Sequence, residues 1–468
     1  MKEDIYEVRC LEKVNRDCLM EASVPGSKSI TNRALLLAAM AKGTSIIHNC
    51  LASDDSIYFM ECLKKLGFFV ESKPEGPLGN QVAVRGLGGE IPCKEATLNV
   101  GSAGTAARFL AAMLAFSDGE YTLESSEQMK KRPMQPLIDA LEQAGARVEC
   151  LEEKGHFPLH ITGVKKRLAE ESSGEKNVNK LRLEDVLPEC ITVNIDQSSQ
   201  FLSALLIAAG TLHQTMEIDV KGSHGLSYAD LTVKMMEQFG VIVNKKVVRG
   251  KLRFLLNGDA AYQAMDYVVE PDMSAASYFY ALAAVLGVRM TIPRVCFPML
   301  QGDTEFIKVL EKMGCRVEET DNSGLVVAGP ADGMLKGGFI LDMSAFSDQA
   351  LTLAAIAPYA DAPVTITGIG HIRLQECDRI QAIVRNLTAL GIETEEREDE
   401  VTIFPGVPKG CEIETYDDHR VAMAFALTGL RTKGVKILNP SCCKKTFGEY
   451  FEVLEQVLSN LQAINFTQ

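Results

Sequence analysis

The sequence predicts an α/β protein built from six copies of one unit. Six Ala-rich segments of helix-forming residues recur along the chain, and each follows a short polar stretch. The residues that align at these segments lie 75, 92, 77, 72 and 71 positions apart by subtraction, and they are Arg33, Arg108, Gln200, Ser277, Gln349 and Arg420. Copies of this length are too long for a solenoid and favour a closed, pseudo-symmetric assembly.

The first helix is expected where residues 25–33 run into residues 34–41. The second part is apolar on all sides, with Gly43 as a C-terminal stop, and a helix that is apolar all round is buried. Hydroxyls, an amide and the cations Lys28 and Arg33 surround its N-terminus, where backbone N–H groups and the helix dipole attract anions. Taken alone, the stretch also fits a capped core helix with two solvated cations.

The other five copies begin in the same way, with small polar residues before an Ala-rich helix. They start at residues 101–110, 197–202, 272–278, 347–351 and 416–421. In each of the first five copies, an amphipathic segment later ends at a glycine and a β-rich run follows. These glycines are Gly67, Gly145, Gly240, Gly314 and Gly391. We expect each to cap a helix before a strand.

The two ends of the chain suggest how the copies are grouped. Residues 1–22 form a strand-like lead-in, and the last copy has a helix over residues 450–461 with no strand after it. The N-terminal segment is therefore expected to complete the last copy. This gives one discontinuous domain, residues 1–23 plus 268–468, and a second domain of residues 24–267. The larger spacing of 92 reveals an insert over residues 165–188, which is charged and contains Gly and Ser, as in a solvated surface loop.

Composition restricts the class of partner. The net charge of −14 argues against a general nucleic-acid or anionic-membrane surface, so an anionic ligand needs a local cationic pocket. The 13 cysteines show no metal-ligand spacing and indicate reduced thiols of a cytoplasmic protein. No apolar run reaches the length of a transmembrane helix.

Motifs for common cofactors are missing. The sequence has no phosphate loop, dinucleotide fingerprint, zinc-protease motif or serine-hydrolase elbow. It does place cations near the expected helix starts: Lys28, Arg33, Arg108, Arg132, Arg379, Arg420 and Lys445. Several adjoin carboxylates, such as Glu376 and Asp418. Such mixed charges in a cleft hold small anions and perform acid/base chemistry, although each one alone is also typical of a surface ion pair.

The ordered motifs of the chain resemble those of the 5-enolpyruvylshikimate-3-phosphate synthase family of enolpyruvyl transferases. They are Gly-Ser-Lys-Ser-Ile-Thr-Asn-Arg at 26–33, Gly-Ser-Ala-Gly-Thr at 101–105, Lys-Arg-Pro at 131–133, Ser-Ser-Gln-Phe-Leu at 198–202, Gln-Gly-Asp at 301–303, Asp-His-Arg at 418–420 and Lys-Thr-Phe at 445–447. The resemblance implies two domains of three βαβαββ units each. It further implies an inside-out α/β barrel with the active site in the interdomain cleft.

The resemblance also implies a reaction and its residues. The family transfers the enolpyruvyl group of phosphoenolpyruvate to the 5-hydroxyl of shikimate 3-phosphate and releases phosphate by addition and elimination, without a metal or organic cofactor. Phosphoenolpyruvate would be bound by Lys28, Gly104, Arg132, Gln200, Arg379, Arg420 and Lys445. Shikimate 3-phosphate would be bound by Lys28, Ser29, Arg33, Ser198, Ser199, Gln200, Tyr228, Asp348, His371 and Gln375. Asp348 would be the base, with Glu376 and Lys28 as proton donors.

Some positions depart from the family pattern on the acceptor side. Gly225 stands where the family usually has a serine, Gln375 replaces a lysine and His371 an asparagine. A paralogue with a different hydroxyl acceptor, or a catalytically silent binding relative, therefore stays an alternative. The relative that acts on UDP-N-acetylglucosamine is disfavoured because Ser29 follows the lysine where that enzyme has asparagine. We expect a monomer, and Gly104 leaves room for the phosphoenolpyruvate analogue glyphosate.

Overall fold

The computed structural model describes residues 4–465, except 12–13, 17, 174–186, 321–323 and 331–332. The chain forms two compact units. The first unit combines Met1–Ser27 with Glu270–Gln468, and the second unit is Lys28–Val269. The chain therefore passes from one unit to the other after Ser27 and returns after Val269. The sequence-based expectation placed these passages near residues 23 and 268.

The second unit contains three four-stranded sheets of one topology. In each sheet an edge strand lies parallel to its neighbour, and the other two strands form an antiparallel pair that continues the sheet. In spatial order, the first sheet contains β14 (Asp266–Val268), β3 (Lys42–Leu51), β5 (Gly79–Leu87) and β4 (Phe69–Pro74). The second contains β6 (Glu95–Asn99), β7 (Glu120–Glu124), β9 (Leu159–Thr162) and β8 (Arg147–Cys150). The third contains β10 (Cys190–Asn194), β11 (Met216–Lys221), β13 (Lys251–Leu256) and β12 (Val243–Val248).

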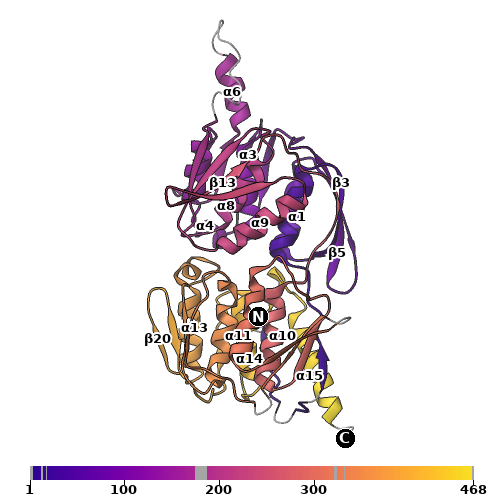
Figure 1. Ribbon diagram of the computed structural model, residues 1–468, viewed down its shortest axis with the longest axis vertical. Coiled ribbons are helices and arrows are strands. Elements are labelled where there is room, and N and C mark those ends of the chain that lie inside the picture. Colours follow the sequence, from indigo (N-terminus) through magenta and orange to yellow (C-terminus); the bar gives the residue numbers. More distant parts are fainter. Residues whose placement is uncertain are drawn as a thin grey trace. The chain divides into compact units, whose positions relative to one another are not determined.

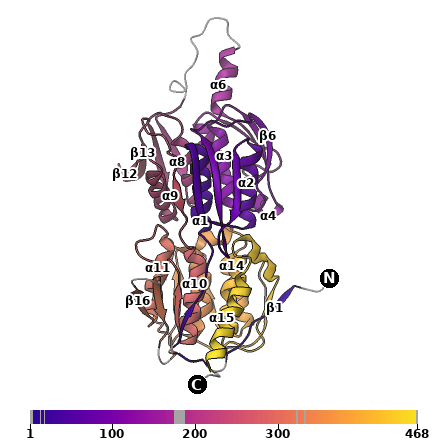
Figure 2. The ribbon, with the colours of Figure 1, turned by 90° about the vertical axis from the view of Figure 1, so that its right-hand side faces the viewer.

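Two kinds of helix connect these strands. Three helices are almost entirely buried, and apolar residues make up most of each: α1 (Lys28–Met40), α3 (Gly104–Ala115) and α8 (Gln200–Ala209). Helix α3 contacts both α1 and α8 (Figure 1 and Figure 2). The remaining helices are α2 (Asp54–Lys65), α4 (Glu127–Lys130), α5 (Gln135–Gln143), α6 (Val164–Ser173) and α9 (Leu226–Gln238).

The first unit repeats the same plan. Two of its sheets have four strands and one has three, in the orders β2 (Leu19–Glu21), β15 (Arg289–Ile292), β17 (Gly324–Ala328) and β16 (Arg316–Thr320); β18 (Phe339–Asp342), β19 (Val364–Thr367), β21 (Val401–Ile403) and β20 (Thr394–Glu396); and β22 (Glu412–Ile413), β23 (Lys436–Leu438) and β1 (Ile5–Glu7). Strand β1 is antiparallel to β23. The N-terminal segment thus completes the sheet of the last copy, as its missing strand led us to expect.

Three helices of the first unit have every residue buried: α10 (Met273–Leu286), α12 (Ala350–Ile356) and α14 (His419–Gly429). Each of the three contacts the other two. The other helical segments are η1 (Gly302–Thr304), α11 (Glu305–Lys312), η2 (Ser347–Gln349), η3 (Ala357–Tyr359), η4 (Gly370–Leu374), α13 (Arg379–Ala389), η5 (Pro440–Lys445) and α15 (Tyr450–Asn465). The predicted α/β class and its two-part division are confirmed.

The glycine pattern is also confirmed. In each case a helix ends two residues before the predicted glycine, and a strand follows. These helices are α2, α5, α9, α11 and α13. All five glycines have positive φ, between 79° and 96°: Gly67, Gly145, Gly240, Gly314 and Gly391. In this region of φ a side chain is strained, so glycine ends the helix and turns the chain toward the next strand.

Two local expectations were wrong. Residues 165–173 were expected in a surface loop but lie in α6, which extends away from the sheets of its unit in both views (Figure 1 and Figure 2). Residues 174–186 of the same insert lie outside the described residues. Gly43 was expected to stop the first helix, but α1 ends at Met40 and Gly43 lies within β3 with φ of 119°. Within the described ranges, no helix is both long and apolar enough to cross a bilayer.

Candidate active site

A buried arginine joins three carboxylates in the first unit. The Arg379 guanidinium donates to Asp418 (Nε to Oδ2, 2.8 Å), to Glu376 (Nη2 to Oε2, 2.9 Å) and to Asp348 (Nη1 to Oδ1, 3.1 Å). Its side chain is 2% exposed. Burial opposes the charge, but the carboxylates of Asp418, Glu376 and Asp348 together raise the pKa of Arg379 above its ordinary value. Arg379 is therefore a permanent cation that fixes these three acidic groups.

Two further cations approach the same carboxylates. Arg420 Nη2 donates to Asp348 Oδ2 at 2.7 Å, and Lys445 Nζ lies 3.2 Å from Glu376 Oε1. Asp348 is thus held by two arginines, while Glu376 is held by Arg379 and Lys445. The six groups, three acidic and three basic, balance one another in charge. Since all are largely buried, their interactions are stronger than those of a surface pair.

Helix starts supply most of this cluster. Arg379 is the first residue of α13, whose N-cap Asp378 accepts from the Gln381 N–H. Asp418 caps α14 and accepts from the Arg420 N–H, so its carboxylate serves the helix and Arg379 together. Asp348 lies in η2, directly before α12. The polar starts of α12, α13 and α14 therefore meet at the Arg379 side chain.

Two of the predicted acceptor-side residues border this cluster. Gln375 Oε1 accepts a short hydrogen bond from Arg379 Nη1. His371 Nε2 lies 2.7 Å from the hydroxyl of Ser347, the residue that precedes Asp348 in the chain. The structure therefore brings together seven of the predicted site residues in the first unit: Asp348, His371, Gln375, Glu376, Arg379, Arg420 and Lys445.

The second unit holds another group of predicted residues. Gly104 begins α3, and a Cβ built there would lie 2.6 Å from Arg132 Nη1 and 2.8 Å from Arg108 Nη1. Arg108 Nη1 in turn donates to Gln200 Oε1 at 2.7 Å, at the start of α8. Arg132 and Arg108 are both buried. Absence of a side chain at residue 104 is what allows two guanidinium groups to lie against this helix start.

Lys28 and Arg33 lie at different depths of α1. Lys28, the first residue of the helix, is partly exposed, and its Nζ lies 3.6 Å from Asp55 Oδ2. Arg33 is buried, and its guanidinium donates to Thr232 Oγ1, Ser203 Oγ and the carbonyl oxygens of Ser29 and Tyr228. Burial lowers the pKa of Arg33 to about 10. Arg33 therefore joins α1 to α8 and α9, and its contact with a ligand stays a prediction.

The hydroxyls of the third copy lie at the start of α8. Ser199 is its N-cap residue, and Ser198 Oγ accepts from the Gln200 N–H at 3.3 Å. Gly225 precedes α9 in a left-handed conformation with φ of 60°. A Cβ there would lie 2.8 Å from Ser199 Oγ, so residue 225 has no room for a side chain unless Ser199 moves.

Sequence reasoning left out several residues of these clusters. Asp418 was expected only as a carboxylate beside the helix-start cations and was not placed in the site, yet it is the most buried of the carboxylates on Arg379. Arg108 was noted as a cation and not placed in the site, and Asp55, the partner of Lys28, was not considered. The available signals were the capping position of Asp418 and the acidic first turn of α2.

Comparison with known proteins decides the family. The model of the family described as EPSP synthase (3-phosphoshikimate 1-carboxyvinyltransferase) matches residues 20–454. The chain belongs to the EPSP synthase family. A relative from Nostoc punctiforme named 3-phosphoshikimate 1-carboxyvinyltransferase is 42% identical, over 97% of this chain and 99% of the relative. The chloroplastic protein of that name from Arabidopsis thaliana is 38% identical over 93% of this chain and 81% of its own length.

Solved structures agree with this family in fold. An EPSP synthase from Acinetobacter baumannii superposes with a TM-score of 0.73 at 24% identity, covering 97% of this chain and 98% of that chain. The enolpyruvyl transferase NikO from Streptomyces tendae gives a TM-score of 0.69 at 16% identity, with 97% of each chain covered. At these identities the likeness concerns the fold alone.

The three positions at which the resemblance predicts departures each have a close neighbour. A Cβ at Gly225 would approach Ser199 Oγ, Gln375 Oε1 accepts from Arg379 Nη1, and His371 contacts the Ser347 hydroxyl. Their effect on the hydroxyl acceptor stays a prediction.

Proposed function

We propose that this protein transfers the enolpyruvyl group of phosphoenolpyruvate to the 5-hydroxyl of shikimate 3-phosphate and releases phosphate. The observation that carries the proposal is the cluster around Arg379. It gathers Asp348, Glu376, Arg420 and Lys445 in a chain of the EPSP synthase family. A balanced group of buried acids and bases supplies both the anion contacts and the proton transfers that this reaction needs.

Phosphoenolpyruvate carries a phosphate and a carboxylate and needs several cations in a site from which water is excluded. We assign its binding to Arg379, Arg420 and Lys445 of the first unit, and to Lys28, Gly104, Arg132 and Gln200 of the second. The planar guanidinium groups suit bidentate contacts, and the lysines act as point charges. Support comes from the burial of Arg132, Arg379, Arg420 and Lys445, because buried charges bind anions with little screening.

The acceptor would occupy neighbouring groups. We assign the phosphate of shikimate 3-phosphate to Ser198, Ser199 and Gln200 at the start of α8, where N–H groups favour anions. Its ring and carboxylate would meet a second set, with His371 and Gln375 nearby: Lys28, Ser29, Arg33, Tyr228 and Asp348. These assignments require both units to serve one site in an interdomain cleft that closes on ligand. Small-angle scattering with and without shikimate 3-phosphate tests closure, and an unchanged radius of gyration would count against it.

In this mechanism Asp348 removes the proton from the 5-hydroxyl, and the oxygen attacks C2 of phosphoenolpyruvate. One proton passes to C3 from Glu376 or Lys28, which gives a tetrahedral intermediate that still carries phosphate. The same group, now a base, takes a proton back from C3 as phosphate leaves. The two arginines on Asp348 and the Lys445 contact of Glu376 hold the carboxylates in place, which general acid–base catalysis requires.

The test is phosphate release from phosphoenolpyruvate with shikimate 3-phosphate and, separately, with other hydroxyl acceptors. Turnover only with another acceptor would assign the chain to a different transferase reaction, and no turnover would leave a binding protein.

Asp348→Asn and Lys28→Met are each expected to lower kcat at least about a hundredfold. The control Asp230→Asn removes an exposed carboxylate paired with Lys245 and should keep the wild-type rate. Near-normal rates in both site variants would overturn the assigned roles.

A further inference from the structure

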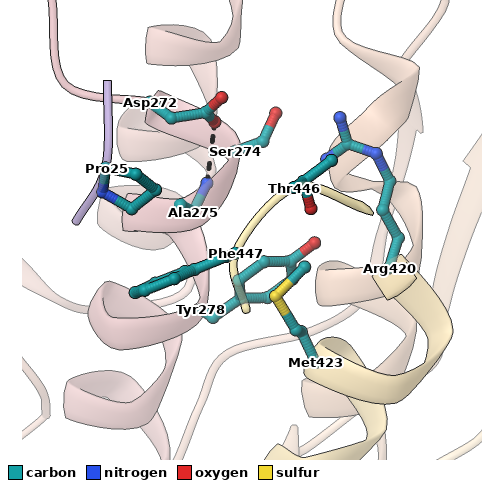
Figure 3. A pocket seen from close by; sticks show the side chains of 9 residues that line it. All are labelled: Pro25, Asp272, Ser274, Ala275, Tyr278, Arg420, Met423, Thr446 and Phe447. Carbon is teal, nitrogen blue, oxygen red and sulfur yellow. Dashed lines mark hydrogen bonds between the residues drawn. The ribbon is translucent and has the colours of Figure 1, made fainter. Parts of the chain in front are cut away.

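A small cavity lies beside Arg420 in the first unit (Figure 3). Its volume is about 10 Å³. Its polar lining comes from Asp272, Ser274, Tyr278, Arg420 and Thr446, and the other walls are apolar. A cavity of this size is at the lower limit for holding one water molecule and is too small for a substrate, a phosphate or a buffer ion.

Two buried hydroxyls face this cavity without a well-formed partner. Tyr278 Oη and Thr446 Oγ1 make no hydrogen bond of ordinary geometry within the described residues. Figure 3 shows both on the side of the cavity where Arg420 lies. Burial raises the pKa of the Tyr278 phenol, and the charge of Arg420, together with a weak side-chain hydrogen bond from it, opposes that shift. A buried hydroxyl that has lost its water partners is unfavourable, so two of them at one cavity call for a shared partner.

The ring of Tyr278 is fixed by packing. Tyr278 is 1% exposed, and its ring meets Tyr450 edge to face at a centroid distance of 5.7 Å. Tyr450 is itself anchored through its hydroxyl, which donates to the Met423 carbonyl at 2.9 Å. The Tyr278 hydroxyl therefore cannot swing toward another acceptor without disturbing this packing.

Arg420 Nη2 donates to Asp348 Oδ2 at 2.7 Å. Asp348 is also the proposed base, so this bond changes when Asp348 gains or loses its proton. A further restraint on Arg420 would keep the guanidinium aligned during that change. The cavity lies where such a restraint would act, between α10, α14 and the segment after η5.

We infer that one ordered water molecule occupies this cavity and, with Tyr278 and Thr446, positions the Arg420 guanidinium for its anionic ligand. Tyr278 and Thr446 are then positioning residues that touch no substrate. Water suits the place because it can accept from Arg420 and Tyr278 and donate to Thr446, with Asp272 and Ser274 at the same cavity. This inference rests on the proposed role of Arg420 toward phosphoenolpyruvate.

The kinetic test compares Tyr278→Phe with the matched control Tyr280→Phe. Loss of one hydrogen-bonding group beside Arg420 should raise KM for phosphoenolpyruvate about three- to tenfold, while KM for shikimate 3-phosphate stays within about twofold. Tyr280 is buried on the same helix, but its hydroxyl donates to the Leu325 carbonyl. Its variant should lower the melting temperature without changing either KM. Equal KM values for phosphoenolpyruvate in wild type and Tyr278→Phe would overturn the inference.

A second pair of variants covers the case in which Tyr278→Phe folds poorly. Thr446→Val should raise KM for phosphoenolpyruvate as Tyr278→Phe does, whereas Thr446→Ser, which keeps the hydroxyl, should restore it. Because both hydroxyls act through one water, the double variant should be no worse than the more impaired single variant. Fully additive effects would contradict a shared water.

Crystallography separates this inference from the proposed function. A high-resolution structure of the wild type should show one water within hydrogen-bond distance of Tyr278, Thr446 and Arg420, and Tyr278→Phe should lose it. If the wild type fails to turn over phosphoenolpyruvate and shikimate 3-phosphate, the proposed function fails, yet this density still decides whether the water exists. An empty cavity in the wild type would dismiss the water itself.

Discussion

Asp303 is a carboxyl group buried in the first unit. It lies in η1 and is 6% exposed. Burial, together with the negative charge of Asp348, raises its pKa to about 7, although Arg420 and a hydrogen bond from Gln349 act in the opposite direction. The folded protein therefore holds this proton over a pH range in which an unfolded aspartate has lost it.

We predict that Asp303→Asn stabilises the protein increasingly as pH rises. The folded-state pKa lies above the unfolded one, so the neutral carboxyl is compatible with folding below about pH 4. Its stability contribution falls as pH rises and is lost once pH passes through about 7. The amide carries no charge, so its advantage in free energy of unfolding should grow to at most about 4 kcal/mol at pH 8.

Urea unfolding at pH 5, 6.5 and 8 measures this difference. The exposed Asp230→Asn variant serves as control, because its carboxyl pairs with Lys245 near the surface. A constant difference between Asp303→Asn and wild type across these pH values would show that Asp303 does not retain its proton.

Gly104 leads to a second prediction at the scale of single residues. An alanine would place its Cβ 2.6 Å from Arg132 Nη1, so this guanidinium must shift. We expect Gly104→Ala to raise KM for phosphoenolpyruvate about tenfold, the loss that accompanies one weakened charged hydrogen bond. Gly448→Ala is the control, since its Cβ would have ordinary contacts at 3.7 Å from Lys444. Steady-state kinetics with each substrate varied in turn would show whether the two variants differ.

At the scale of elements, Arg379 joins the starts of three helical segments. It is the first residue of α13, while Asp348 lies in η2 and Asp418 caps α14. Asp348 lies 31 residues away within the same copy, whereas Asp418 lies 39 residues away at the start of the next copy, so the guanidinium joins two copies.

We predict that Arg379→Met lowers the free energy of unfolding by about 3–5 kcal/mol, because it leaves buried carboxylates without their cation. Arg397→Met is the matched control: Arg397 is 72% exposed and pairs with Glu400 three residues later, which predicts a change below about 0.5 kcal/mol. Guanidinium denaturation of both variants compares them directly. Equal effects would mean that the Arg379 cluster adds no more stability than a surface pair.

At the scale of the whole molecule, the chain joins distant segments in single sheets. Strand β1 pairs with β23, so Ile5 faces Leu438, and the Val8 N–H donates to the Val435 carbonyl at 2.9 Å. The Tyr6 ring packs on Phe451 with centroids 4.3 Å apart. Likewise β2 opens the sheet of the fourth copy, and β14 opens that of the first. Strands β1, β2 and β14 thus each complete a sheet whose other strands lie elsewhere in the sequence.

We predict that deleting residues 1–8 lowers the melting temperature of the first unit by roughly 5–10 °C, since β23 would keep only the two-residue partner β22. Hydrogen exchange at Lys436–Leu438 should lose protection, while β6, β7 and β9 in the second unit keep theirs. Tyr6→Phe is the comparison variant, because it retains the strand and removes only the 2.5 Å bond to Glu455. Unchanged exchange in the truncated chain would refute a supporting role for β1.

Local signals in the sequence determined the repeated elements. The Ala-rich segments, the caps at Gly67 and its four counterparts, and the cations near helix starts all follow from short-range chemistry. The insert was misjudged because its charges describe a solvated helix as well as a loop, and α6 is such a helix. Roles toward substrates came from the family resemblance, and they stay predictions.

Tertiary structure alone decided which of these groups meet. Asp418 pairs with Arg379 across 39 residues, and Asp348 pairs with Arg420 across 72. The space at Gly104 and Gly225 is likewise set by side chains distant in sequence, Arg132 and Ser199, which lie 28 and 26 residues away. A sequence pattern records what a segment prefers within a few residues, whereas ion pairing, cavity size and steric room depend on packing between segments far apart in the chain.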